Sequence, residues 1–178
     1  MSKRAAGPPS GSNITLIGMP GAGKSTVGVV LAKKLSFAFV DTDILIQARQ
    51  GQSLQQILDT EGYKVLRHLE EEEILQLQGV NSVIATGGSA VYSQKAMEHL
   101  QQISTIVFLD LPYAEICRRI HDFETRGIAC APQQSFAELY AERLLLYRQY
   151  ADLTLKNPTA TQDEVADSII AHVQNMAE

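Results

Sequence analysis

Short apolar runs that alternate with longer helical stretches are the feature that most limits how this chain can fold. Each run is apolar on both faces, which is typical of strands buried inside a parallel sheet. We predict strands at 14–17, 38–40, 83–85, 106–109 and 153–155. Helical patterns lie at about 24–35, 43–59, 61–78, 93–102, 112–121, 135–150 and 161–176. Strands that alternate with helices predict an α/β fold, a doubly wound five-stranded parallel sheet flanked by helices in three layers.

The length of the chain, 178 residues, fits one domain. Residues 1–12 are rich in Gly, Pro and Ser, so we expect a disordered leader followed by a single domain over 13–178. Residues 122–134 break the strand–helix rhythm and carry Gly127 and Pro132. A loop of this length inside a compact domain is usually functional or disordered.

Charge and cysteine content exclude several classes of protein. The net charge of −5 argues against a nucleic-acid binder, which needs a basic face. Cys117 and Cys130 form neither a disulfide framework nor a zinc pattern and suit a reducing compartment. The sequence has no apolar run of the roughly 18–20 residues that a membrane helix needs, and no secretory signal. We therefore expect a cytoplasmic monomer without nucleic-acid or membrane partners.

Residues 18–25 read GMPGAGKS and fit the phosphate-binding pattern G-x-x-x-x-G-K-[ST]. The motif follows a predicted strand and opens a predicted helix, which is the context that distinguishes it from a glycine-rich turn that binds nothing. Its glycines allow successive backbone N–H groups to converge on phosphate oxygens, and the helix N-terminus adds its positive dipole end. Lys24 would bridge the β- and γ-phosphates, and the Ser25 hydroxyl would bind Mg²⁺.

A phosphate-binding loop indicates a nucleotide but not a reaction. One hypothesis is an enzyme that moves the γ-phosphoryl group of ATP to a small acceptor. Another is a nucleotide-binding module without transferase activity, which would need partner surface and base-reading motifs that the sequence lacks. A kinase needs an acceptor pocket, a proton acceptor and a lid that excludes water.

Asp41 and Asp43 follow the second predicted strand, and ligands of parallel sheets bind beyond the carboxyl ends of the strands. One carboxylate could hold Mg²⁺, and the other could bind the acceptor hydroxyl and take its proton. The alternative is that one of them only caps the next helix, and both roles are compatible.

Several further motifs stand in a fixed order. They are Glu61-Gly62 followed by Leu66-Arg67-His68-Leu69-Glu70, Thr86-Gly87-Gly88, Arg126-Gly127-Ile128-Ala129, and Arg143 followed by Tyr147 and Ala151-Asp152. With the GMPGAGKST loop and Asp41-Thr42-Asp43, they resemble the shikimate kinase family from Ile14 to about Pro158. The resemblance implies a fold like that of P-loop nucleoside monophosphate kinases, close to the adenylate kinase type, with a lid at about 122–134.

The resemblance also implies phosphorylation of a shikimate hydroxyl with ATP and Mg²⁺, to give shikimate 3-phosphate and ADP. The implied catalytic residues are Lys24, Asp43 and Arg126, with Arg126 moving in with the lid. The implied nucleotide ligands are Gly18, Gly21, Ala22, Gly23, Lys24, Ser25, Thr26, Arg119, Arg126 and Pro158. Shikimate would contact Asp43, Arg67, Gly87, Gly88 and Arg143, and Mg²⁺ would contact Ser25 and Asp41. A planar guanidinium matches a carboxylate with two parallel hydrogen bonds, so paired arginines suit an anionic acid.

Four positions depart from the family pattern. Ser89 replaces the third glycine of the triplet and would be strained if that residue needs a positive φ. Gly127 replaces a proline and would loosen the lid, Leu66 replaces an aromatic residue, and Lys156 replaces an arginine. These departures keep open the alternative hypothesis that the chain is a paralogous kinase acting on another small hydroxy acid. A nucleoside monophosphate kinase is disfavoured by the carboxylate-type arginine pair.

Residues 70–73 are four consecutive glutamates, which we predict to form a solvated helix face. Within that run, Glu70 could support Arg67 through an ion pair at i, i+3.

Overall fold

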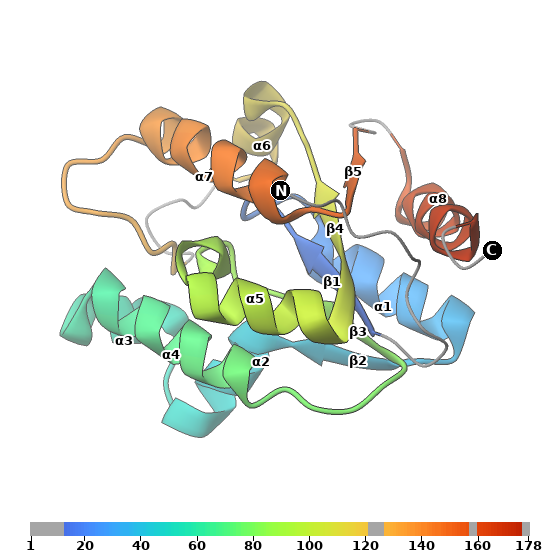
Figure 1. Ribbon diagram of the computed structural model, residues 1–178. Coiled ribbons are helices and arrows are strands. Elements are labelled where there is room, and N and C mark those ends of the chain that lie inside the picture. The colour runs from blue at the N-terminus through green and yellow to red at the C-terminus, as the bar shows by residue number, and fades with distance from the viewer. Residues whose placement is uncertain (1–12, 121–126, 157–159, 176–178) are drawn as a thin grey trace.

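The computed structural model describes residues 13–120, 127–156 and 160–175 of the chain. One sheet with strand order β2-β3-β1-β4-β5 runs through its centre (Figure 1). The strands are β1 (Asn13–Ile17), β2 (Ala38–Asp41), β3 (Ser82–Ala85), β4 (Ser104–Leu109) and β5 (Leu153–Leu155). Every pairing is parallel. The predicted five-stranded parallel sheet is confirmed, and each strand lies within two residues of its predicted bounds.

Helices cover both faces of the sheet, which explains why its strands are apolar on both sides. On one face α1 (Lys24–Leu35) packs against α8 (Gln162–Asn175), and on the other lie α5 (Gln94–Ile103) and α7 (Phe136–Tyr150) (Figure 1). The remaining elements are α2 (Thr42–Gln50), α3 (Leu54–Glu61), α4 (Tyr63–Leu75), α6 (Tyr113–Arg119) and the 3₁₀ helix η1 (Ala90–Tyr92). Among the described residues, no helix is long and apolar enough to cross a membrane.

The predicted helix at 43–59 is wrong, because the structure divides it into α2 and α3. Gly51 ends α2 in the left-handed conformation, with φ 65°. Ser53 then starts α3 with a capping box, in which its hydroxyl accepts from the Gln56 N–H at 3.2 Å and the Gln56 side chain accepts from the Ser53 N–H at 2.8 Å. The apolar periodicity continues through this break, and the local cap chemistry decides where the helices end.

Helices α2, α3 and α4 share a small second core of Ile46, Ile57, Leu66 and Ala129. Ala129 comes from the predicted lid, of which the structure describes residues 127–134. At the start of that segment the Gly127 N–H donates to the Gln55 side chain at 2.9 Å. The φ of Gly127 is +67°, which proline cannot adopt, and a Cβ there would lie 2.6 Å from the Leu54 Cβ. Glycine at this position therefore lets the segment lie directly on α3.

Replacing Ser53 with alanine should lower the free energy of unfolding by about 1 kcal/mol, because the capping box loses its hydroxyl acceptor. Chemical denaturation measures the change. Ser53→Asp is the matched control, since its carboxylate also accepts from the first-turn N–H groups and should retain most of the stability. Equal losses in the two variants would show that the cap does not stabilise α3.

Candidate active site

The phosphate-binding loop (residues 18–25) runs from the carboxyl end of β1 into the amino end of α1. Side chains of Asp41, Ser53, Ser93 and Ser135 cap α2, α3, α5 and α7. Within the described ranges no side chain caps α1, whose N-cap is Gly23 and whose first turn has no acidic residue. The first N–H groups of α1 are therefore left to an anion at the helix N-terminus.

The Lys24 side chain lies over this loop. Its ammonium group donates to the carbonyls of Gly18 at 2.8 Å and Met19 at 3.0 Å. Burial lowers the pKa of Lys24 to about 8, against the opposing effect of the nearby Asp43 carboxylate. The ammonium group is mostly charged at neutral pH and is held by two carbonyls that a phosphate could replace.

Ser25 and Asp41 pair oxygen atoms at the exposed side of the loop. The Ser25 hydroxyl donates to Asp41 Oδ2 at 2.6 Å. Asp41 Oδ1 accepts from the backbone N–H of Asp43 at 3.0 Å and of Ile44 at 3.4 Å, which caps α2. Asp41 therefore caps α2 with one carboxylate oxygen and places the other beside Ser25. Capping the helix does not prevent Asp41 from lying where the predicted Mg²⁺ ligand should be.

A cavity of about 200 Å³ opens beside the phosphate-binding loop. Charged groups from four elements line it, namely Lys24, Asp43, Glu70 and Arg143. Gly88 and Ser89 border it, and residues 127–129 of the predicted lid form another wall. We call this the acceptor cavity.

Asp43 and Glu70 approach each other in the acceptor cavity over Gly87. A Cβ on Gly87 would lie 2.7 Å from Asp43 Oδ1 and would overlap Glu70 Oε1, so any larger residue there would displace both carboxylates. Burial raises the pKa of Asp43 to about 6. Burial, followed by the charge of Asp43, raises the pKa of Glu70 to about 7. The two carboxyl groups therefore become protonated, and so neutral, at a higher pH than exposed carboxyl groups do.

Two guanidinium groups, Arg67 and Arg143, lie together at the same cavity, and we call them the arginine clamp. Arg143 Nη2 donates to the Ala129 carbonyl at 2.6 Å, and Arg67 Nη2 approaches the same oxygen at 3.5 Å. Among the described residues, neither Nε has a hydrogen-bond partner, although both atoms are buried. The Arg67 guanidinium carbon lies 3.6 Å from the ring centroid of Tyr92, and that of Arg143 lies at 5.5 Å. A buried cation, Arg143, and a partly buried one, Arg67, each with an unused buried Nε–H donor, favour an anionic ligand.

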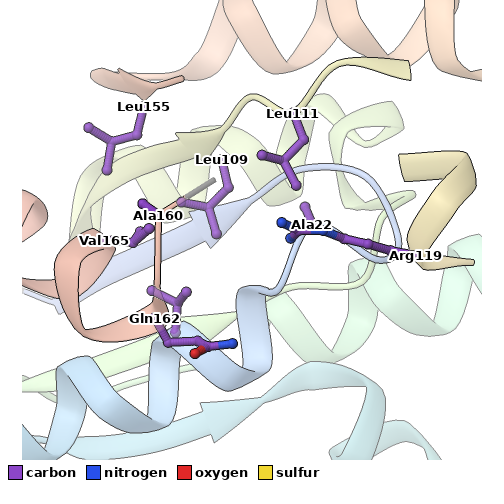
Figure 2. A pocket seen from close by; sticks show the side chains of 9 residues that line it. Ala22, Leu109, Leu111, Arg119, Leu155, Ala160, Gln162 and Val165 are labelled. Atoms are coloured by element: carbon purple, nitrogen blue, oxygen red, sulfur yellow. The ribbon is translucent and has the colours of Figure 1, made fainter. Parts of the chain in front are cut away.

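A second, smaller cavity of about 60 Å³ lies beside the phosphate-binding loop at Ala22, and most of its lining residues are apolar (Figure 2). Its lining residues are Ala22, Val27, Leu109, Leu111, Arg119, Leu155, Ala160, Gln162 and Val165. The Arg119 side chain extends toward Ala22 (Figure 2), and its Nε donates to Glu115 at 2.6 Å. Pro158 and the lid residue Arg126, both predicted to contact the nucleotide, lie outside the described residues.

A family model described as shikimate kinase matches residues 20–174. The chain belongs to the shikimate kinase family. It is 38% identical over 170 residues to the shikimate kinase of Paracidovorax citrulli, covering 93% of this chain and 90% of that one. It is 32% identical over 159 residues to the shikimate kinase of Aquifex aeolicus, covering 89% and 94%.

Solved shikimate kinases also match the fold. The structure of the Acinetobacter baumannii shikimate kinase in complex with shikimate gives a TM-score of 0.86 at 29% identity, over 93% of this chain and 94% of that one. The Aquifex aeolicus shikimate kinase structure gives a TM-score of 0.77 at 31% identity, over 92% and 96%. At 19% identity and a TM-score of 0.51, the Mycobacterium tuberculosis APS kinase shares the fold alone.

The structure brings most of the predicted shikimate kinase residues together. Lys24, Ser25, Asp43, Gly88 and Arg143 line the acceptor cavity, and Arg67 joins Arg143 at Ala129. One predicted contact is already occupied. The Gly87 N–H, which the resemblance assigned to shikimate, donates to the Thr42 hydroxyl at 3.0 Å.

The backbone of Ser89, which replaces a glycine of the family pattern, does not have the positive φ that would strain a serine. Its φ is −98°, which any L-residue adopts. Its side chain is buried and donates to a Glu70 carboxylate oxygen. The serine therefore adds a hydroxyl to the acceptor cavity without distorting the backbone.

The prediction of a solvated glutamate face is wrong for two of its four members. Glu70 and Glu73 are 3% and 5% exposed, whereas Glu72 is exposed. The i, i+4 and i, i+3 spacing of Leu66, Glu70 and Glu73 places all three on the inner face of α4 and could have revealed this. Tyr92 carried no comparable signal, because its contact with Arg67 joins η1 to α4 across the cavity.

The raised pKa values predict how stability depends on pH. From about pH 4 to 7 the folded state holds protons on Asp43 and Glu70 that the unfolded state has lost, so stability should fall as pH rises. Glu70→Gln removes one of these groups and should reduce the fall by about 3 kcal/mol. Thermal unfolding at several pH values measures it.

Glu72→Gln, on the exposed side of the same helix, is the control and should keep the wild-type slope. An unchanged slope in Glu70→Gln would show that Glu70 ionises as an exposed glutamate does.

Proposed function

We propose that this protein transfers the γ-phosphoryl group of ATP to a hydroxyl of shikimate, giving shikimate 3-phosphate and ADP. The observation that carries the proposal is the arginine clamp, with two unused buried Nε donors, at a cavity that also holds Lys24 and Asp43. Family membership supports the reaction. The similarity to the Acinetobacter baumannii enzyme, whose structure contains shikimate, supports the acceptor.

The phosphate-binding loop would hold the nucleotide phosphates on the free N–H groups of α1. Lys24 would exchange its two carbonyl acceptors for phosphate oxygens, which are better partners for a buried ammonium group. The apolar cavity beside Ala22 and Arg119 would hold the adenine base. We propose that Thr26 extends the phosphate contacts and that Pro158 closes the adenine side, as the family resemblance implies.

Ser25 and Asp41 fit Mg²⁺ as a pair of hard oxygen donors 2.6 Å apart. Among the described residues no three His, Cys, Asp or Glu side chains could jointly bind a metal. The fit therefore needs water and phosphate oxygens as well, which is how Mg²⁺ is usually held. When bound, the ion would neutralise charge on the phosphates.

Asp43 is the proposed proton acceptor. With a pKa of about 6 it is mostly ionised at neutral pH and can take the proton of a bound hydroxyl. The hydroxyl oxygen forms the new bond to the γ-phosphorus, the bond to the bridging oxygen breaks, and ADP keeps the electron pair. Lys24 neutralises charge on the phosphoryl group, and Arg126 of the lid is proposed to do the same. Residues 127–129, which wall the cavity, would help to exclude water.

One observation favours a second acceptor. The Ser89 hydroxyl stands in the acceptor cavity where the family pattern has glycine, so its polar group could suit another small hydroxy acid. We further propose that the chain works as a monomer. We also propose a cytoplasmic location, which its free cysteines Cys117 and Cys130 support.

Release of ADP from ATP and Mg²⁺ should depend strongly on added shikimate, because the acceptor hydroxyl is the nucleophile. A coupled assay with and without shikimate measures it. Lys24→Ala should lose most of this activity while the protein stays folded. Near-normal turnover in that variant would contradict the proposal that residues 18–25 bind the phosphates of ATP. Binding of ATP without stimulation by shikimate would move the proposal to another hydroxy acid.

Arg143→Ala should weaken shikimate binding by about 2–5 kcal/mol, because the acceptor carboxylate loses a buried partner. The KM for shikimate measures the effect, and the KM for ATP should change little. Arg148→Ala, on the same helix but half-exposed beside Asp110, is the matched control. An unchanged KM for shikimate in Arg143→Ala would show that Arg143 is structural.

A further inference from the structure

The Arg67 guanidinium is oriented by aromatic faces rather than by hydrogen bonds. Its carbon lies 3.6 Å from the ring centroid of Tyr92 and 5.0 Å from that of Tyr63. Its contact with the Ala129 carbonyl is 3.5 Å long, at the limit for a hydrogen bond. In the part of the chain that the structure describes, Arg67 forms no ion pair within 4 Å, and its buried Nε has no partner. The Tyr92 ring, which lies under the guanidinium carbon, is therefore the nearer of the two aromatic rings that contact this cation.

Contact through the face has a chemical consequence for ligand binding. A carboxylate partner would occupy the in-plane N–H donors of the guanidinium with two parallel hydrogen bonds. An aromatic ring attracts the cation through its π face and uses none of those donors. Tyr92 therefore orients Arg67 while leaving its N–H edge for an external carboxylate.

The same ring also lies near the second arginine of the clamp. The Arg143 guanidinium carbon is 5.5 Å from the Tyr92 centroid, and the Arg143 side chain is only 1% exposed. Two like charges placed together at a partly desolvated site repel each other. The negative face of the ring and the shared Ala129 carbonyl supply negative potential on both cations.

The position of Tyr92 is set by the glycine segment at the end of β3. Tyr92 is the last residue of η1, and its N–H donates to the Ser89 carbonyl at 3.0 Å. Ser89 follows Gly88, and both residues border the acceptor cavity. The segment that borders the acceptor cavity thus also carries the ring that orients the clamp.

We propose that Tyr92 is a positioning residue, which holds the Arg67 guanidinium by its face and leaves its N–H edge to the carboxylate of the acceptor. The identity of that carboxylate rests on the proposed function. The role of the ring is a property of the protein alone.

Kinetics of two variants separate the ring from the hydroxyl. Tyr92→Leu should raise the KM for shikimate about tenfold, because Arg67 loses its nearest π face. Its kcat and its KM for ATP should stay within about twofold of wild type, since the clamp binds ground state and transition state alike. Tyr92→Phe keeps the ring and should restore wild-type values. Tyr63→Leu, which removes the ring at 5.0 Å, should raise the KM less than Tyr92→Leu.

A change in the ligand tests whether the carboxylate is what Tyr92 serves. Shikimate and its primary carboxamide are compared as ligands by calorimetry. Wild type should prefer the carboxylate strongly, and Tyr92→Leu should shrink that preference by about the same tenfold factor. An equal preference in wild type and Tyr92→Leu would assign the ring a packing role and overturn the proposal.

A spectroscopic readout needs neither acceptor nor turnover. In ¹H–¹⁵N spectra the Arg67 Nε–H resonance, assigned from Arg67→Lys, should carry a ring-current shift from Tyr92. The shift should vanish in Tyr92→Leu and persist in Tyr92→Phe. A resonance that is unchanged in Tyr92→Leu overturns the proposal. Loss of the shift in a protein that does not phosphorylate shikimate would keep the positioning role and refute the proposed function instead.

Discussion

Parallel pairing of β1 with its neighbours is the constraint on which the site depends. Leu16 pairs with Ala85, Ile17 with Phe108, and Asp41 of β2 also pairs with Ala85. The residues that follow these strands therefore emerge at one edge of the sheet, although they are far apart in the sequence. A slip of one residue would move a strand by about 3.3 Å and exchange the side chains of its two faces, so the close packing of the buried strands β1, β3 and β4 fixes their register. The packing of the sheet thus sets the separation of Lys24 from Asp43.

Charge balance is the second requirement of the acceptor cavity. Lys24 and Arg143 line the cavity with Asp43 and Glu70, and Arg67 approaches Arg143 at the Ala129 carbonyl. An isolated charge in such a region would be costly to bury. Burial raises the pKa of both carboxyl groups, so each holds its proton more tightly than an exposed carboxyl group does. An anionic acceptor would add the negative charge that the arginine clamp lacks. The cost of burying these cations without a full complement of negative charge therefore favours the proposed anionic ligand.

Periodicity predicted the sheet, and a motif of fixed spacing predicted the phosphate-binding loop. The clustering of Asp43, Gly88 and Arg143 was implied by the resemblance to the shikimate kinase family. The break between α2 and α3 was not predicted, because the apolar periodicity continues through the break while the capping box of Ser53 starts a new helix there. Glu70 was misjudged because a run of four glutamates conceals a helical spacing that buries two of them. The contact of Tyr92 with Arg67 could not be predicted at all, because it depends on how η1 and α4 meet in space.

The nucleotide side and the acceptor side of the site are built from different kinds of chemical group. Backbone N–H groups and one lysine form the side at the phosphate-binding loop, whereas side chains from α2, α4, η1 and α7 form the acceptor side. Substitutions at Arg67, Ser89 or Tyr92 can reshape the acceptor cavity without touching the backbone that would hold the nucleotide. An ancestral protein with this architecture could acquire new acceptors one side chain at a time while the phosphoryl donor stayed the same. Such modularity gives a single fold a route to diversify its substrates through small, independent evolutionary steps.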